Sequence, residues 1–292
     1  GSATGVRYQD KKTVSATLAD GYNFTGWKDA NGDIVSTSLS YEVTMPNEDY
    51  TLTAIAAPMT NIKYTVVHKL QSLENENLYN TARTDTYWDG VTDAKTNVTA
   101  DTFVGFTAQT VTQQTVTADG NAIVEVLYDR TSYELTLQIH SDDVSTAGIA
   151  FVAFASKQVK YGATQSLSAT MNKGYSFQMW KDVADPYTEY ATNNSEYNFV
   201  MPAGAVTLDA YAIANTNTSY TGKHMKQDLD GSYPDNQDYV EYEAKTGTTG
   251  QDTDAQARTE PTYESYAGFT AGTITQLKVA GNGSTEVVIS LH

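Results

Sequence analysis

The chain repeats itself, and this repetition limits its fold more than any local pattern, because repeated segments form the same structural unit each time. Residues 6–29 align without a gap with residues 159–182, and both copies contain Gly-Tyr-x-Phe-x-x-Trp-Lys-Asp. A Met-Pro pair and a following apolar run recur as well, as Met45-Pro46 with TLTAIA and Met201-Pro202 with TLDAYA. We call this repeated segment the A unit.

A second and different segment, the B unit, follows each A unit. Five positions of its first strand region recur in order: Tyr64, Thr65, His68, Gln71 and Leu73 return as Tyr220, Thr221, His224, Gln227 and Leu229. The sequence GFTA at 105–108 also returns at 268–271. The order A-B-A-B predicts four modules, at residues 1–62, 63–131, 132–215 and 216–292.

Composition and turn signals indicate a mainly β fold. A length of 292 residues favours more than one domain, since a domain has about 150 residues. The chain is rich in Thr and Tyr, which prefer strands. Turn pairs stand before predicted strands at Asn31-Gly32, Asp119-Gly120 and Asn282-Gly283. Only residues 71–83 and 252–259 could form a short helical turn, so we predict small, β-rich modules.

The first A unit starts late in its repeat. Residues 133–158 precede the matched part of the second A unit, and they contain two runs typical of strands. Nothing equivalent precedes Val6. Either the first sheet lacks one or two strands because the repeat is cut, or the first A unit is naturally shorter.

Charge and cysteine content exclude several classes of function. The net charge is -17, which disfavours nucleic acid and anionic lipid as partners because both would repel the chain. Cysteine is absent, so no disulfide, thiolate metal site or cysteine nucleophile is available. No apolar run approaches the roughly 20 residues needed to cross a bilayer. We therefore expect no nucleic acid partner and no membrane insertion.

Both units resemble known repeat families. The A unit, with GYNFTGWKD, Met45-Pro46 and TLTAIA, resembles divergent internalin-type B-repeats. The B unit, with YTVVHKLQ and GFTA, resembles the repeats of mucin-binding proteins. This resemblance implies β-grasp-like modules, arranged in an elongated array, in a bacterial surface adhesin whose cell-wall anchor lies elsewhere in the protein.

The sequence predicts no enzymatic activity and no cofactor, because no motif for a nucleophile, a phosphate loop or a catalytic metal is present. We expect a monomeric stalk or spacer that presents a binding region to host mucin, glycoprotein or matrix. The alternative is that the B units themselves bind mucin-type glycans through exposed tyrosines. The candidate binding residues are Tyr79, Tyr87, Tyr233 and Tyr239.

Three other groups of residues could suggest ligand sites, but each has a simpler structural explanation. Trp27 with Phe24, and Trp180 with Phe177, could form a sugar platform, yet we expect them on one strand face in the core. His68 and His224 lack the further ligands of a zinc site, so we expect strand-surface histidines. Calcium could use four aspartates near one turn, although the turn alone explains them: Asp228, Asp230, Asp235 and Asp238. A Lys–Asn cross-link is compatible with the composition, which does not indicate its position.

Overall fold

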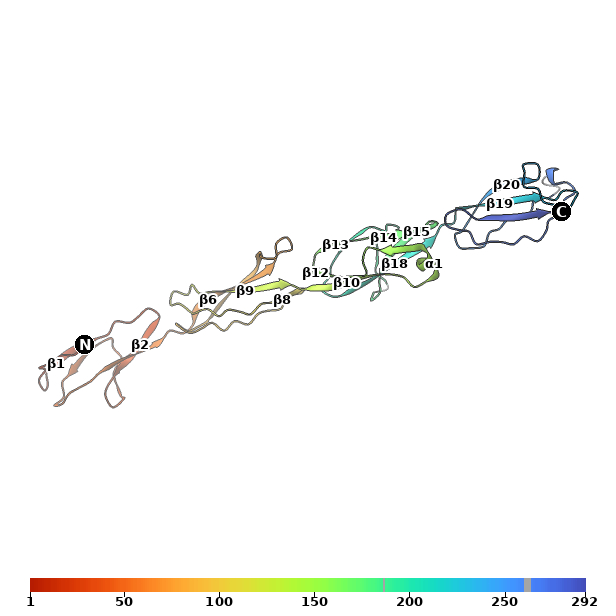
Figure 1. Cartoon of the computed structure of the whole chain (residues 1–292). Coiled ribbons are helices and arrows are strands. Elements are labelled where there is room, and N and C mark those ends of the chain that lie inside the picture. Colours follow the sequence, from red (N-terminus) through yellow and green to blue (C-terminus); the bar gives the residue numbers. More distant parts are fainter. Residues whose placement is uncertain (186, 260–263) are drawn as a thin grey trace. The chain divides into compact units, whose positions relative to one another are not determined.

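The computed structural model confirms the mainly β fold, with 47% of residues in strands and 3% in helices. It describes residues 1–185, 187–259 and 264–292. The chain forms two compact units, Gly1–Thr131 and Ser132–His292, which Figure 1 colours from red to yellow and from green to blue. The division into four modules stays a prediction.

The first compact unit contains three sheets. One pairs β1 (Lys11–Ser15) with β4 (Ser40–Thr44), and a second has β2 between β3 and β5. The third sheet has the order β7-β6-β9-β8. The remaining strands are β2 (Tyr22–Lys28), β3 (Ile34–Ser36), β5 (Thr53–Pro58), β6 (Ile62–Gln71), β7 (Tyr79–Gly90), β8 (Phe106–Ala108) and β9 (Ile123–Arg130).

The second compact unit contains a five-stranded sheet of order β12-β10-β18-β15-β16 and a three-stranded sheet of order β20-β19-β21. Two smaller sheets pair β11 with β14 and β13 with β17. Its strands are β10 (Ser132–Ile139), β11 (Ile149–Val152), β12 (Ser156–Lys160), β13 (Thr164–Leu167), β14 (Ala169–Met171), β15 (Tyr175–Asp182), β16 (Glu189–Tyr190), β17 (Tyr197–Val200), β18 (Val206–Ala214), β19 (Thr218–Lys226), β20 (Val240–Gly247) and β21 (Glu286–Leu291).

One topological feature recurs in three sheets: an early strand pairs in parallel with a late one. These pairs are β6 with β9, β10 with β18, and β19 with β21. Parallel neighbours need a long crossover, and here each crossover contains loops and further strands, with α1 between β10 and β18. In each case the parallel pair brings together residues far apart in sequence, so these sheets depend on non-local contacts.

Helix is confined to α1 (Asp143–Gly148) and to the short 3-10 turn η1 (Glu264–Tyr266) in the described residues. Asp142 caps α1, and its side chain accepts a hydrogen bond from the amide of Ser145. Neither of the two segments that could have formed a helical turn is helical. Residues 71–83 contain the start of β7, and residues 252–259 contain no helix. Their polar residues form loops and exposed strand positions instead.

Three of the four aromatic residues of the A units, Trp27, Phe177 and Trp180, lie in the core as predicted, and Phe24 is half-buried. Trp27 is 7% exposed and Trp180 is fully buried, and in each copy the Trp ring lies 5.5–5.8 Å from its Phe. Trp follows Phe by three positions, which in a regular strand would place the two side chains on opposite faces. A β-bulge between Phe24 and Gly26, repeated after Phe177, returns both rings to one face.

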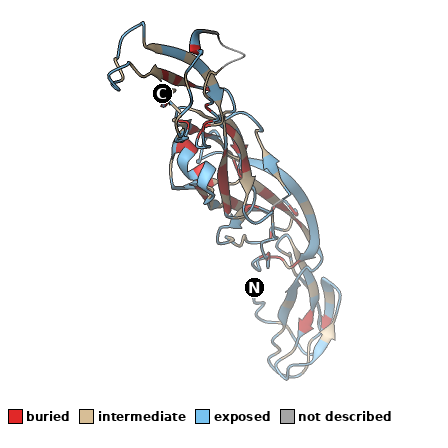
Figure 2. Cartoon of the chain, turned by 90° about the vertical axis from the view of Figure 1, so that its right-hand side faces the viewer, coloured by how far each residue is buried: buried red, intermediate tan, exposed pale blue. Residues whose placement is uncertain are grey.

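The predicted turn at Asn31-Gly32 joins β2 to β3. Gly32 has φ of +97°, and the carboxylate of Asp29 accepts hydrogen bonds from the amides of Asn31 and Asp33. Figure 2 shows buried positions, in red, gathered on the inner strands. Buried apolar residues form three core clusters, which contain Tyr64 of β6, Trp180 of β15 and Tyr220 of β19. The sheets that contain these three strands therefore each have their own core.

Candidate functional site

The first candidate site is the contact between the A and B units inside the first compact unit. The carbonyl of Gly21 accepts a hydrogen bond from the amide of Met59 at 2.7 Å, and the carbonyl of Met59 accepts one from Thr92 at 3.0 Å. A Cβ on Gly21 would lie 2.6 Å from Thr92 Cγ2 and 2.7 Å from Ala118 Cβ. We call Gly21, Met59, Thr92 and Ala118 the first A–B joint. Its backbone contact leaves no room for a larger residue.

The second compact unit contains the same arrangement. The carbonyl of Gly174 accepts a hydrogen bond from Asn215 at 2.9 Å, and that of Asn215 accepts one from Thr249 at 3.0 Å. A Cβ on Gly174 would collide with Gly281 Cα and lie 2.6 Å from Thr249 Oγ1. We call Gly174, Asn215, Thr249 and Gly281 the second A–B joint. Met59 and Asn215 occupy the same repeat position but have different side chains. The two joints therefore share their backbone hydrogen bonds and not their side-chain contacts.

Side chains reinforce both joints. Tyr22, next to Gly21, donates its hydroxyl to Asp93 at 2.6 Å, which raises the pKa of Tyr22. In the second joint, the hydroxyls of Thr218 and Thr249 lie 2.7 Å apart, and Ser176 donates to the side chain of Asn215 at 2.7 Å. The bond between Tyr22 and Asp93 links the first A unit to its B unit, whereas the two bonds of the second joint hold Thr249 and Asn215 within their own units.

Each B unit buries a histidine in a polar network, which corrects the prediction of strand-surface histidines. His68 is 1% exposed, and its Nδ1 lies 2.7 Å from the hydroxyl of Tyr128. Its Nε2 lies 3.2 Å from a carboxylate oxygen of Asp85. Arg83 pairs with both Asp85 and Asp101. The histidine is buried because the rings of Phe103 and Tyr128 pack against its imidazole, at 5.9 Å and 5.8 Å.

The second B unit has a related network with different residues. His224 is fully buried, its Nε2 lies 3.2 Å from Glu243, and Arg258 pairs with Glu241 and Glu243. In the described part of the chain, His224 Nδ1 has no hydrogen-bond partner. The residue matching Tyr128 in the GFTA-based alignment is Leu291, which cannot supply a hydroxyl. Burial is the main cause that lowers the pKa of His224.

The first network contains the cluster in the described residues that has metal-ligand geometry: His68, Asp85 and Asp101. The guanidinium of Arg83 already pairs with both carboxylates, and a metal cation there would lie beside this positive charge. The network therefore fits a structural ion pair better than a metal centre. The aspartates considered for calcium serve other roles, since Asp230 accepts the amide of Ser232 and Asp235 pairs with Lys223.

The candidate glycan-binding tyrosines have different surroundings. Tyr87 is 41% exposed and stacks on Tyr64 at 5.5 Å. The other three are half-buried. Tyr79 donates to Asp129 at 2.5 Å, Tyr239 donates to Asp228 at 3.0 Å, and Tyr233 contacts His292. Tyr79 begins β7 and Tyr87 lies near its other end, so these two tyrosines of the first B unit are not adjacent.

Sequence reasoning overlooked Trp88, which follows Tyr87 on β7 and is 64% exposed. β7 is an edge strand of its sheet, and both aromatic side chains are accessible there. In the second B unit, the strand positions that correspond to Tyr87 and Trp88 are occupied by Lys245 and Thr246. These two residues pair with Tyr220 and Ser219. The aromatic pair is therefore specific to the first B unit, and the presence of a third Trp outside the A units could have indicated it.

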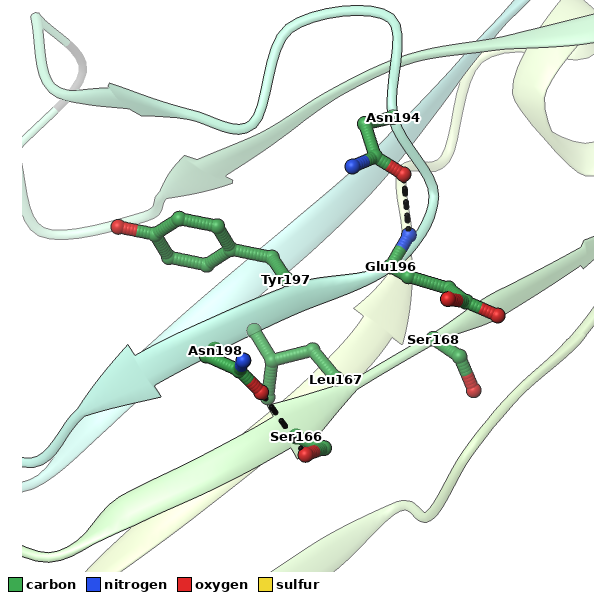
Figure 3. A pocket seen from close by; sticks show the side chains of 7 residues that line it. All are labelled: Ser166, Leu167, Ser168, Asn194, Glu196, Tyr197 and Asn198. Carbon is green, nitrogen blue, oxygen red and sulfur yellow. Dashed lines mark hydrogen bonds between the residues drawn. The ribbon is translucent and has the colours of Figure 1, made fainter.

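A polar hollow of about 700 Å³ lies beside β13 and β17 (Figure 3). Tyr197 and Leu167 contribute its apolar part, and Ser166 donates to Asn198 at 2.9 Å. The Asn194 side chain accepts the amide of Glu196 at 3.0 Å. Hydroxyl, amide and carboxylate groups beside one aromatic ring can hydrogen-bond a sugar, but most of these groups already bond one another.

The comparisons with known proteins support the interpretation of the A units. The family model of the divergent InlB B-repeat domain matches residues 1–55 and 143–212. These segments lie in the two A units, so the resemblance of the B units to mucin-binding-protein repeats stays a prediction. A search of curated proteins gives no match. Among the described residues, no helix has both the length and the apolar character required to span a membrane.

Two solved proteins show weak structural similarity. The Bacillus anthracis TIE protein is 9% identical with a TM-score of 0.35, over 97% of this chain and 68% of that chain. The pilus adhesin SpaC from Lactobacillus rhamnosus GG is 10% identical with a TM-score of 0.24, over 86% of this chain and 45% of that chain. This chain therefore spans less than half the length of SpaC. TM-scores this low carry no argument about function.

Proposed function

We propose that this chain is a non-enzymatic repeat region of a bacterial cell-surface adhesin and acts as a spacer. The observation that carries the proposal is that both compact units build the same A–B joint. Each joint closes two backbone hydrogen bonds around a glycine that has no space for a side chain. The two joints keep these backbone hydrogen bonds although other residues in them differ. Such a contact suits a segment whose role is to hold neighbouring modules in a fixed orientation.

The absence of cysteine makes the stiffness of the joint directly measurable. Cysteines introduced at Asn31 and Asn80, both exposed and outside the joint, can carry a pair of spin labels. A stiff spacer gives one narrow distance distribution between the labels. In the variant Gly21→Val, steric collision with Thr92 should broaden it. A broad distribution in the unchanged joint would contradict the spacer function.

Direct glycan binding is the second candidate, and the exposure of Tyr87 and Trp88 on β7 favours it. The full chain should be applied to an array of mucin-type glycans, beside the variant Trp88→Ala. Saturable binding that disappears in this variant would favour glycan recognition by the first B unit. Binding that is lost only in Tyr233→Ala or Tyr239→Ala would instead place it in the second. The spacer proposal expects no saturable signal from any of these proteins.

A surface position follows from the same proposal. The family match to a repeat type of surface proteins supports it, and the net charge of -17 would keep neighbouring chains apart on a crowded surface. Attachment to the cell wall would then come from another region of the full protein. Antibodies against the chain should label intact cells if this is right, and label only broken cells if it is wrong.

A further inference from the structure

The turn of the second B unit that contacts the A unit contains an Asn-Gly pair. The amide of Gly283 donates a hydrogen bond to the carbonyl of Ala280 at 2.9 Å, which closes a β-turn. Asn282 is exposed at this turn, and Gly283 has φ of +78°. The sequence has one other Asn-Gly pair, at Asn31-Gly32. Glycine after asparagine leaves its backbone nitrogen open to approach, because it has no side chain to shield it.

The first A–B joint has the same turn with a different residue in it. In the GFTA-based alignment, Asn282 matches Asp119 and Gly283 matches Gly120. The amide of Gly120 donates to the carbonyl of Thr117 at 3.0 Å, so the two turns close in the same way. Asp119 shows that a carboxylate at this position is compatible with an intact joint. At this position the second joint differs by having a side-chain amide.

The turn of the second joint is packed tightly against the A unit. Gly281, the residue before the Asn-Gly pair, lies against the backbone of Lys173 and Gly174. A Cβ on Gly281 would collide with the carbonyl oxygen of Lys173 and lie 3.2 Å from Gly174 Cα. Within the B unit, Thr285 Oγ1 accepts the amide of Ala280 at 2.8 Å and holds the start of the turn. An extra backbone atom inside this turn would therefore displace it from the A unit.

Hydrogen bonds activate the side-chain amide of Asn282 toward attack. Its Oδ1 accepts the amide of Ser284 at 3.0 Å and the hydroxyl of Ser284 at 2.6 Å. Two donors on one carbonyl oxygen stabilise the negative charge that develops there when a nucleophile adds to Cγ. The nucleophile is the nitrogen of Gly283, which is released when its hydrogen bond to Ala280 opens locally. Among the described residues, the side chain of Asn31 has no such donors.

We propose that Asn282 is a site of spontaneous deamidation, and that its product loosens the second A–B joint as the chain ages. The nitrogen of Gly283 loses its proton to solvent and bonds to Asn282 Cγ, and the Cγ–Nδ2 bond breaks as ammonia leaves with a proton from solvent. Water then opens the succinimide ring at either carbonyl. One product is aspartate. The other is isoaspartate, whose main chain runs through the former side chain and is longer by one carbon–carbon bond, about 1.5 Å.

The first A–B joint should change far more slowly. The hydrogen bond from the Thr117 hydroxyl is the main cause that lowers the pKa of Asp119, so its carboxylate stays ionised. A backbone nitrogen attacks an ionised carboxylate poorly, because negative charge is already spread over both oxygens. One joint would then loosen with time while the other stays fixed. This consequence rests on the proposed spacer function, which the spin-label experiment tests separately on freshly prepared chain, whereas conversion of Asn282 is measured chemically.

The test follows the full chain during incubation in mildly alkaline buffer. Peptide mapping by mass spectrometry measures aspartate and isoaspartate at residues 282 and 31, because replacement of the amide by a carboxyl group changes the peptide mass. Asn282 should convert faster than Asn31. Ser284→Ala should slow conversion of Asn282 by about two- to tenfold, the effect of one ordinary hydrogen bond. The proposal is overturned if Asn282 converts no faster than Asn31.

Amide exchange at Asn215 and Thr249 reports the state of the second joint, because these amides donate its two backbone hydrogen bonds. Exchange there should become about tenfold faster or more once isoaspartate has formed, while Met59 and Thr92 keep their rates. Freshly prepared Asn282→Asp is the matched control, since it has the carboxylate on an ordinary backbone, and it should exchange like the unmodified chain. Incubated Asn282→Gln should keep its rates, because glutamine cyclises more slowly. Conversion without faster exchange at Asn215 and Thr249 would also overturn the proposal.

Discussion

The carbonyl oxygen of Gly21 accepts a hydrogen bond from the amide of Met59 at 2.7 Å, and Gly174 makes the equivalent bond with Asn215 at 2.9 Å. Both glycines have positive φ, +81° and +84°. A residue with a Cβ is strained in this conformation and would also collide with the B unit. Two independent constraints therefore require glycine at this position of each A–B joint.

Gly21→Ala should destabilise the first A–B joint by about 2–4 kcal/mol, since backbone strain adds to overpacking. Gly5→Ala is the matched control, because Gly5 also has positive φ, +72°, but open space around its Cα. It should cost about 1–2 kcal/mol, the backbone strain alone. Amide exchange at Met59 and Thr92 measures the difference. Equal effects of the two variants would show that steric collision with Thr92 and Ala118 is unimportant.

Tyr128→Phe should destabilise the first B unit by about 1–3 kcal/mol, since it leaves the buried His68 Nδ1 without its partner and removes the acceptor of the Asp101 amide. The hydroxyl of Tyr128 lies 2.7 Å from His68 Nδ1 and accepts the amide of Asp101 at 3.1 Å. Urea unfolding of the full chain measures the loss. Tyr8→Phe, on an exposed tyrosine, serves as the control and should change stability by less than about 0.5 kcal/mol. An unchanged transition in Tyr128→Phe would mean that water replaces the hydroxyl.

The second B unit should lose stability as the pH falls below about 6.5. Burial lowers the pKa of His224, so the unfolded state binds a proton more readily than the folded state in this range. The lost stability amounts to about 1.4 kcal/mol for each unit by which the pKa is lowered. Unfolding of the full chain at about pH 7.5 and pH 5.5 measures this effect.

His224→Gln provides the control for this pH dependence, because glutamine does not titrate. The variant should lose less stability between the two pH values. At lower pH both proteins should lose stability again, because the pKa of Glu241 is lowered in the folded state. The hydrogen bond from the Tyr266 hydroxyl is the larger cause of this lowering and the charge of Arg258 the smaller one. Glu241 stabilises the fold above its unfolded-state pKa, near 4.5, and this contribution disappears as it is protonated. An identical slope in both proteins would exclude His224 as the titrating group.

The sequence predicted those features that repeat or that local chemistry controls. The turn at Asn31-Gly32 forms because asparagine and glycine tolerate the required backbone angles. The burial of Trp27 and Trp180 follows from their size and apolar character. The mainly β composition was also sufficient to predict the class of the fold. Each of these features depends on residues close together in sequence.

Features that depend on distant residues were missed or predicted wrongly. His68 is buried because Tyr128, sixty positions later, supplies a partner for its ring nitrogen. Nothing in the local sequence around His68 indicates this contact. The A–B joints are similar, because the recurrence of Gly21 as Gly174 was visible, but its contact with Thr92 depends on how two units pack. The helix α1 is only six residues long, so its periodicity is too short to detect.

Ser145→Ala should destabilise the second A unit by about 1–3 kcal/mol. The Ser145 hydroxyl is fully buried, accepts the amide of Ala212 at 3.1 Å and donates to Asp142 at 3.1 Å. Alanine fits the space but leaves the amide of Ala212 buried without this acceptor. Ser156→Ala is the control, since Ser156 is exposed and bonds Glu134 on the surface. Amide exchange at Ala212 measures the effect directly, and unchanged exchange would show that α1 does not contribute this hydrogen bond in solution.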